Sequence, residues 1–241
     1  LRRQRQMCIR DSYSLTPAGA AAPGEAQGRI LVPFPIESSL SGVQRGVTPQ
    51  EALWYETTFE VPAAWRRGND VLLHFGAVDW RAEVYVNDLL VGSHTGGYTP
   101  FSFDITPALS AKGVQKLTVK VTDSTDKGFQ PHGKQVLEPH GIWYTPVTGI
   151  WQTVWLESVP DIYIEKLNIE NHGASVTIST VPPLEGTVSV EQLGQFPLEH
   201  GQVTIAPENP HFWCPDDPYV YRFTVETAQD KVESYFAIRS L

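Results

Sequence analysis

The residues best suited to contact a ligand lie in one aromatic run, Gly141 to Glu157, which reads GIWYTPVTGIWQTVWLE. It contains Trp143, Tyr144, Trp151 and Trp155 within seventeen residues that carry one charge. An exposed indole can stack on the apolar C–H face of a sugar ring, whereas a buried one only fills a core. The chemistry of this run therefore depends on which aromatic residues lie in a loop.

Alternation of side chains divides the run into a loop and a strand. From Ile150 to Leu156 apolar residues fall on both faces, which predicts a strand covered on both sides, with Trp155 in the core. The preceding TPVTG is typical of a loop, and Trp143 and Tyr144 stand ahead of it. Because loops on a rigid β-scaffold often carry binding residues, we expect Trp143 or Tyr144 to lie near a ligand. Ordinary packing between domains is the equal alternative.

Other residues capable of chemistry show no cluster. The seven histidines form no i, i+4 pair and no mixed Cys/His/Asp group, so we predict no metal site and no cofactor. The paired glycines of HTGGY, His94 to Tyr98, lack the helix start and the Lys-Ser/Thr pair of a phosphate loop. They favour a tight bend with positive φ instead.

The composition excludes several functional classes. The 241 residues are 41% hydrophobic and 19% charged, enough for one large or two ordinary globular cores. A formal net charge of −9 disfavours binding to nucleic acid, and no apolar run approaches the roughly 20 residues that cross a bilayer. Cys8 and Cys214 suggest no disulfide framework, so the cellular compartment stays open.

The N-terminal segment has an unusual origin in our interpretation. MCIRDS, Met7 to Ser12, back-translates to a sequence that resembles the transposon end used to prepare sequencing libraries. We therefore exclude about the first twelve residues from the fold as an assembly artefact. The small-residue stretch that follows reads as disordered, so residues 1–29 are predicted to be artefactual or disordered.

Beyond Ile30 the dominant period is two, which predicts an almost all-β chain. WRAEVYVND places Ala82, Val84 and Val86 on one face and ends at a hairpin turn, Asn87-Asp88. KLTVKVTD and YVYRFTVET repeat the scheme, and no segment keeps helical periodicity for three turns.

Two domains follow from strand length and spacing. Residues 30–159 have longer strands and long connections, which suits a jelly-roll β-sandwich. Residues 160–241 have some seven short strands with Pro-containing turns, which suits an immunoglobulin-like β-sandwich. Val159-Pro160-Asp161 is the expected hinge.

Several blocks of sequence resemble a known family. LWYETTFEVPAAW, LLHFGAVDWRAEVYVNDLLVGSHTGGYTPFSFDIT and GIWQTVWLE are similar to the N-terminal sugar-binding domain, a galactose-binding-domain-like jelly roll, of family 2 glycoside hydrolases. FWCPDDPYVYRFTVE and VESYFAIRSL resemble the immunoglobulin-like second domain of those β-galactosidases, β-glucuronidases and β-mannosidases. One departure is Ala237, where the family more often has Gly.

The resemblance implies that the catalytic machinery lies elsewhere. Family members carry an acid/base Glu and a nucleophilic Glu on a (β/α)₈ barrel that follows these sandwiches, and they hydrolyse terminal β-linked glycosides with retention. No pair here suits that role, since Glu37, Asp79 and Asp104 stand singly as caps or loop hydrogen-bonding groups and Asp216-Asp217 are adjacent in a turn. We expect the chain alone to hydrolyse nothing. Its partners would be the carbohydrate substrate of the intact enzyme and the missing barrel, with no nucleic acid and no membrane.

The resemblance also implies which residues approach the sugar. Glu37 lies in VPFPIES, which is similar to a family loop that turns toward the barrel, although a surface or interdomain ion pair is the alternative. Lys134 and Gln135, in GKQ, lie in a long loop expected near the active site. Trp143 stands where related galactosidases and glucuronidases hold an Asp that reaches the pocket, which weakens any transfer of their specificity.

Three alternatives remain open. The chain is the N-terminal part of such an enzyme, a free-standing carbohydrate-binding or adhesive module, or a structural protein with decayed sugar loops. A downstream reading frame that encodes a barrel supports the enzyme, and an immediate stop codon supports the binder.

Overall fold

The structure is a computed structural model that describes residues 4–7, 11–66, 68–111 and 113–239. The chain forms two compact units, one of residues Gln4–Glu157 and one that begins at Ser158. This division falls two residues before the boundary expected from the sequence.

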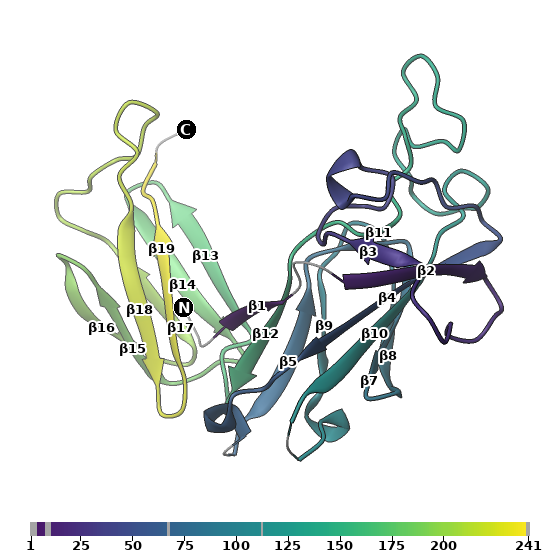
Figure 1. Cartoon of the computed structure of the whole chain (residues 1–241). Coiled ribbons are helices and arrows are strands. Elements are labelled where there is room, and N and C mark those ends of the chain that lie inside the picture. Colours follow the sequence, from purple (N-terminus) through teal and green to yellow (C-terminus); the bar gives the residue numbers. More distant parts are fainter. Residues whose placement is uncertain (1–3, 8–10, 67, 112, 240–241) are drawn as a thin grey trace. The chain divides into compact units, whose positions relative to one another are not determined.

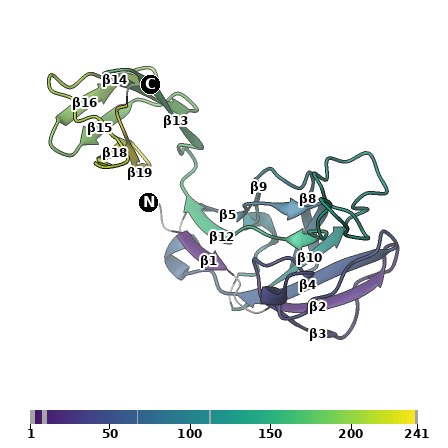
Figure 2. The same cartoon turned by 90° about the horizontal axis from the view of Figure 1, so that it is seen from above.

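The first unit is built from antiparallel sheets (Figures 1 and 2). The six-stranded sheet has the order β3 (Gly28–Ile30), β2 (Asp11–Pro17), β4 (Glu51–Phe59), β10 (Gln115–Thr122), β7 (Arg81–Val86), β8 (Leu89–Thr95). The four-stranded sheet has the order β1 (Gln4–Met7), β12 (Val154–Val159), β5 (Asp70–Phe75), β9 (Phe101–Asp104). A short pair joins β6 (Val78–Asp79) to β11 (Gly149–Ile150).

Helical structure is confined to short turns in this unit. The described residues contain three 3₁₀ turns, η1 (Ser39–Ser41), η2 (Ala63–Arg66) and η3 (Thr106–Ala108), and no α-helix. No helix in the described ranges is long and apolar enough to span a membrane. The expectation of an all-β sandwich is confirmed.

The predicted alternation produces the core of this unit. Ala82, Val84 and Val86 of β7 are fully buried. The neighbouring β10 buries Leu117, Val119 and Val121, and Thr118 between them is buried as well. Asn87 and Asp88 form the turn into β8 with φ of 50° and 65°, the backbone that a tight right-twisted hairpin requires. Period-two patterning therefore identified these strands correctly.

The aromatic strand differs from the expectation. Trp155 is only half-buried and stacks on His74, with ring centroids 4.8 Å apart. Its neighbours Val154 and Leu156 are the residues of β12 that face the core. Trp151 is also half-buried, and its indole N–H donates to the Gly97 carbonyl at 2.8 Å. The opposite face carries Trp155 and the buried Glu157, so both faces are covered, but the expectation that Trp155 lies in the hydrophobic core was wrong.

The N-terminal residues also differ from the expectation. Asp11–Pro17 form β2, which pairs with β4, and Gly28–Ile30 form β3 at the edge of the same sheet. Residues 1–29 are therefore not disordered as a whole. The sequence pattern did not predict β2, because its apolar signal is short and only Leu15 of its apolar residues lies in the core. The proposed artefactual origin of the first twelve residues stays a prediction, and residues 1–3 and 8–10 lie outside the described part of the chain.

The second unit is a smaller β-sandwich. One sheet has the order β13 (Lys166–His172), β14 (Ser175–Val181), β17 (Gln202–Ile205). The other has the order β16 (Gly194–Leu198), β15 (Gly186–Val190), β18 (Tyr221–Thr227), β19 (Lys231–Phe236). A core that includes Ile178, Val188, Phe223 and Phe236 lies within it. This arrangement confirms the immunoglobulin-like class.

Candidate functional site

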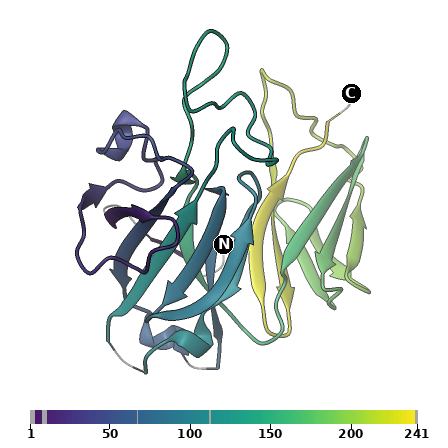
Figure 3. The same cartoon turned by 90° about the vertical axis from the view of Figure 1, so that its right-hand side faces the viewer.

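Two long connections and one tight bend meet in the first unit. They are residues 31–50 between β3 and β4, residues 123–148 between β10 and β11, and residues 96–100 between β8 and β9. The 123–148 loop, teal to green in Figures 1 and 3, extends beyond the ends of the strands. Four of the predicted site residues, Lys134, Gln135, Trp143 and Tyr144, lie on this loop. They belong to its two arms, residues 134–136 and 143–147.

Gln135 joins the loop to the sandwich. Its amide nitrogen lies 3.3 Å from Oδ2 of Asp79 and 3.4 Å from the hydroxyl of Tyr98. Its amide oxygen accepts from the Val147 backbone N–H at 2.5 Å. The amide N–H groups and the amide oxygen of Gln135 therefore all have hydrogen-bond partners, and Gln135 ties the two arms of the loop together.

The backbone of the two arms is paired as well. Tyr144 N–H donates to the Lys134 carbonyl at 2.7 Å, and Val136 N–H donates to the Tyr144 carbonyl at 3.0 Å. His140 and Trp143 exchange two backbone hydrogen bonds, at 2.9 and 3.2 Å. These bonds fix the positions of the aromatic residues near the end of the loop.

Glu37, in the connection of residues 31–50, holds the C-terminal end of the 123–148 loop. Its Oε2 accepts from the Thr148 N–H at 3.0 Å, while its buried Oε1 has no hydrogen-bond partner. Burial raises the pKa of Glu37 to about 7, and the Thr148 hydrogen bonds only partly oppose this. Glu37 therefore acts as a buried loop anchor, in keeping with the loop hydrogen-bonding role expected for it.

Asp123 holds the start of the loop. Its carboxylate accepts from Thr125 N–H at 2.8 Å, from Gln130 Nε2 at 2.9 Å and from Thr148 Oγ1 at 3.4 Å. Burial raises its pKa in spite of these bonds. Since Thr148 contacts both Asp123 and Glu37, the two anchors share one residue.

Asp79 is as deeply buried as Asp123. It is 4% exposed, and its pKa rises to about 6 because of burial and, second, the negative charge of Asp123. Gly97 lies directly against the Asp79 carboxylate, so close that a Cβ at Gly97 would collide with it. This contact, with φ of 137° at Gly96, gives a physical reason for the paired glycines of HTGGY. The expected positive φ is confirmed at Gly96.

The loop exposes several apolar side chains on its surface. Trp143 is 40% exposed, and Tyr144 is 61% exposed with Lys134 Nζ 5.9 Å from its ring centroid. Phe129 and Ile142 are exposed on the same loop. The loop thus presents aromatic and aliphatic side chains from a backbone that buried polar groups hold in place.

The structure brings the predicted residues into two layers. Gln135 and Glu37 lie inside as anchors, whereas Lys134, Trp143 and Tyr144 lie outside on the loop surface. Sequence reasoning missed Tyr98, Asp123 and Thr148 as parts of the anchor. No local signal marks them, because their contacts join residues far apart in the chain.

The carboxylates of the anchor are used to hold the long loop. Glu37 and Asp79 accept from Thr148 and Gln135 of that loop, and Asp123 accepts from Thr125 within it. Asp79 and Asp123 are buried, and Glu37 is half-buried. Asp104 accepts from the Thr106 N–H at 2.8 Å, so it is a loop hydrogen-bonding group rather than the N-cap of η3, which is Ile105. Within the described ranges, no group of three His, Cys, Asp or Glu side chains is arranged to hold a metal.

Comparison with known proteins identifies the family. Residues 30–160 match the family described as glycosyl hydrolases family 2, sugar binding domain, and residues 161–239 match glycosyl hydrolases family 2. The chain belongs to glycosyl hydrolase family 2. Both matches agree with the resemblance seen in the sequence blocks, and in the same order.

Curated relatives of this family 2 chain are enzymes. It is 30% identical over 196 residues to a β-galactosidase of Thermoanaerobacter pseudethanolicus, covering 72% of this chain and 25% of that protein. It is 26% identical over 222 residues to a β-glucuronidase of Paenibacillus borealis, covering 81% of this chain and 37% of that protein. The family 2 chain therefore spans well under half the length of these relatives.

Solved structures support the fold of the family 2 chain. A β-glucuronidase of Faecalibacterium prausnitzii matches 99% of it with a TM-score of 0.74 at 22% identity. A β-glucuronidase of Ruminococcus gnavus matches 99% with a TM-score of 0.75 at 20% identity. In each case the matched region is 46% of the solved chain.

Proposed function

We propose that this chain is the non-catalytic N-terminal part of an enzyme that hydrolyses terminal β-linked glycosides with retention at the anomeric carbon. The observation that carries this proposal is the match of two successive family 2 domains in the family's order. Relatives named as β-galactosidase and β-glucuronidase both occur among the matches, so a β-galactoside and a β-glucuronide are the first substrates to test.

The hydrogen bonds of the anchor carboxylates support a non-catalytic role for this chain. Retaining hydrolysis needs two carboxyl groups about 5 to 5.5 Å apart, facing the bond that breaks. Glu37 and Asp79 instead bond Thr148 and Gln135 of the long loop. The chain by itself is therefore expected to be inactive.

The long loop is the part of this chain that we place next to the sugar in the intact enzyme. Trp143 and Tyr144 offer exposed ring faces, and Lys134 adds a positive charge beside the Tyr144 ring. An aromatic ring can pack on the C–H face of a pyranose while the neighbouring cation bonds its hydroxyl groups. Gln135 and Glu37 act through the loop that they hold, as positioning residues.

The test uses the full-length gene and a panel of chromogenic β-glycosides. We expect the intact enzyme to turn over at least one of them and the 241-residue chain to turn over none. Trp143→Ala in the intact enzyme should lower kcat/KM by about tenfold or more, a loss of roughly 1.4 kcal/mol in transition-state binding.

A matched control separates this effect from general damage. Tyr235→Ala removes a ring that is 62% exposed on β19 of the second unit, and it should leave kcat/KM unchanged. Robust turnover by the 241-residue chain, or a full-length protein with no turnover on the panel, would contradict the proposal.

A further inference from the structure

A groove crosses the outer face of the six-stranded sheet, away from the long loop. Two hollows meet there, and both are lined by Trp54, Glu56 and Thr118. One extends over β2 toward Tyr13. The other, of about 350 Å³, extends over β10 and β7 toward Tyr85 and is within the size range of small-molecule sites.

The floor of the groove follows from the strand register. Thr118 of β10 lies opposite Glu56 of β4 on one side and opposite Tyr85 of β7 on the other. Lys120 stands one step along the same face, opposite Trp54. Since strands lie about 4.8 Å apart, a ligand that crosses β2, β4, β10 and β7 spans about 14 Å, which suits a chain of units rather than one ring.

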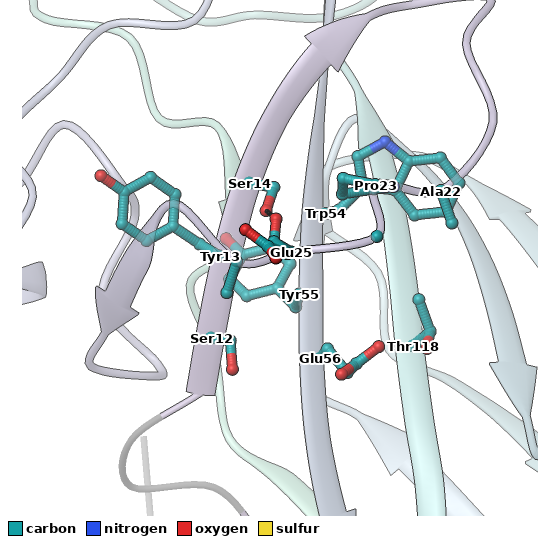
Figure 4. Close-up of a pocket in the computed structure, with 12 residues that line it drawn as sticks. Ser12, Tyr13, Ser14, Ala22, Pro23, Glu25, Trp54, Tyr55, Glu56 and Thr118 are labelled. Carbon is teal, nitrogen blue, oxygen red and sulfur yellow. Dashed lines mark hydrogen bonds between the residues drawn. The ribbon is translucent and has the colours of Figure 1, made fainter.

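One wall is a loop of small residues held in a fixed place. Figure 4 shows Ala22 and Pro23 beside the Trp54 ring, with Glu56 and Thr118 together on neighbouring strands. Alanines and a proline leave the space open, because they have little side-chain bulk.

Hydrogen bonds attach this loop to β2. The Gln27 side chain accepts from Leu15 N–H at 3.1 Å and donates to the Leu15 carbonyl at 3.0 Å. Ser14 Oγ donates to the Glu25 carbonyl at 3.2 Å. The groove is therefore formed before any ligand arrives, which lowers the entropy cost of binding.

The groove carries charged groups of both signs, with a small excess of carboxylates. Its carboxylates are Glu25, Glu56 and Asp88, and its ammonium groups are Lys116 and Lys120. Lys116 already pairs with Asp88 at 2.5 Å. A lining with three acids and two bases favours neither an anion nor a cation strongly, so a neutral polar ligand is the best match.

Two polar groups lie on the floor of the groove: Glu56 is exposed, and Thr118 lies opposite it with 7% of its surface exposed. Within the part of the chain that the structure describes, neither the Glu56 carboxylate nor the Thr118 hydroxyl has a side-chain hydrogen bond. The half-buried Tyr85 ring stands beside them, oriented by a 3.1 Å bond from its hydroxyl to Glu83. An acceptor, a hydroxyl and a ring face within one row are the groups that recognise a sugar.

We propose that this groove binds a neutral oligosaccharide chain, with Glu56 and Thr118 bonding its hydroxyl groups and the Tyr85 ring against one sugar face. The site is separate from the long loop and needs no catalytic barrel.

Isothermal titration calorimetry on the 241-residue chain tests the proposal. The probes are neutral β-linked gluco- and galacto-oligosaccharides, from disaccharide to hexasaccharide, and an acidic hexasaccharide of uronic acids. We expect at least one neutral hexasaccharide to bind with millimolar or better affinity, more tightly than its disaccharide and than the acidic probe. Tyr85→Ala and Glu56→Gln should each weaken binding by about tenfold or more.

Two controls keep the result specific. Glu208→Gln changes an exposed carboxylate in the second unit, and Tyr235→Ala removes an exposed ring there; both should bind as the unchanged chain does. Tyr85→Phe keeps the ring and folding contacts and should retain most of the affinity. The proposal is overturned by absent binding of every neutral probe, by preference for the acidic probe, or by binding that Tyr85→Ala and Glu56→Gln leave intact. These outcomes are independent of the hydrolysis assay on the full-length protein, so either proposal can fail alone.

Discussion

Gln135 Nε2 lies 3.3 Å from Asp79 Oδ2, although the two residues are 56 positions apart in the chain. This contact links the long loop to β6 through a carboxylate that is almost completely buried. Because a buried carboxylate without a partner is costly, the pair fixes the loop more firmly than an exposed pair would.

Removing Gln135 should destabilise the first unit. Gln135→Leu leaves Asp79 and the Val147 N–H without their partner, and we expect a loss of about 1 to 3 kcal/mol in the free energy of unfolding. Urea unfolding followed by Trp fluorescence measures it. Lys134→Ala, which alters the neighbouring side chain and no buried hydrogen bond, should change stability by less than about 0.5 kcal/mol. Equal effects of the two variants would argue against the anchor.

The pH dependence of stability follows from the raised carboxyl pKa values. Glu37 titrates at about 7 and Asp79 at about 6 in the folded chain, against 4.5 and 3.8 as the ordinary values. Between these values the folded state binds more protons than the unfolded state, so stability rises as pH falls. The contribution is complete below about pH 4 and is lost as pH rises through 6 to 7.

Urea unfolding at pH 5, 6, 7 and 8 checks this direction, and Glu37→Gln isolates one group. The variant keeps an acceptor for the Thr148 N–H but cannot ionise, so its stability should be higher at pH 8 and should depend less on pH. A steeper dependence in Glu37→Gln would show that another group controls the slope.

The glycine beside Asp79 should tolerate no side chain. A Cβ at Gly97 would collide with the Asp79 carboxylate, so Gly97→Ala should destabilise by about 1 to 3 kcal/mol. Gly46→Ala is the matched control, because no atom lies within 4 Å of a Cβ at that position. It should be neutral or stabilise by about 0.4 to 1 kcal/mol. Thermal unfolding of both variants measures the difference, and similar shifts would contradict the packing at Asp79.

The hairpin turn at Asn87 and Asp88 allows the effects of backbone conformation and of side-chain hydrogen bonds on stability to be measured separately. Asn87 donates to the Ala108 carbonyl at 2.9 Å and to Gln115 Oε1 at 2.8 Å, whereas Asp88 makes an exposed ion pair with Lys116. Asn87→Gly keeps the positive φ but removes the bonds, and it should cost about 1 to 3 kcal/mol. Asp88→Gly should lie within about 0.5 kcal/mol of the unchanged chain. Chemical denaturation measures the free energy of unfolding of each variant. A larger loss in Asp88→Gly than in Asn87→Gly would contradict the prediction.

Local patterning predicted most strands because their signal is contained in a few consecutive residues. Alternation at Ala82, Val84 and Val86 states which face is buried, since side chains of a strand point to opposite sides. The same reasoning failed for β2, whose short polar sequence becomes a strand only by pairing with β4. It also overestimated the burial of Trp155, since alternation cannot tell which face a second layer covers.

The sequence by itself determined the all-β class, the family and the loop that carries Trp143 and Tyr144, because these depend on residue order and local period. Only the tertiary structure decided that Glu37 reaches Thr148, 111 positions away, and that a groove crosses β4, β10 and β7. Contacts of this kind require chain segments that are distant in sequence to meet, and their geometry is set by how the strands pair and the loops close.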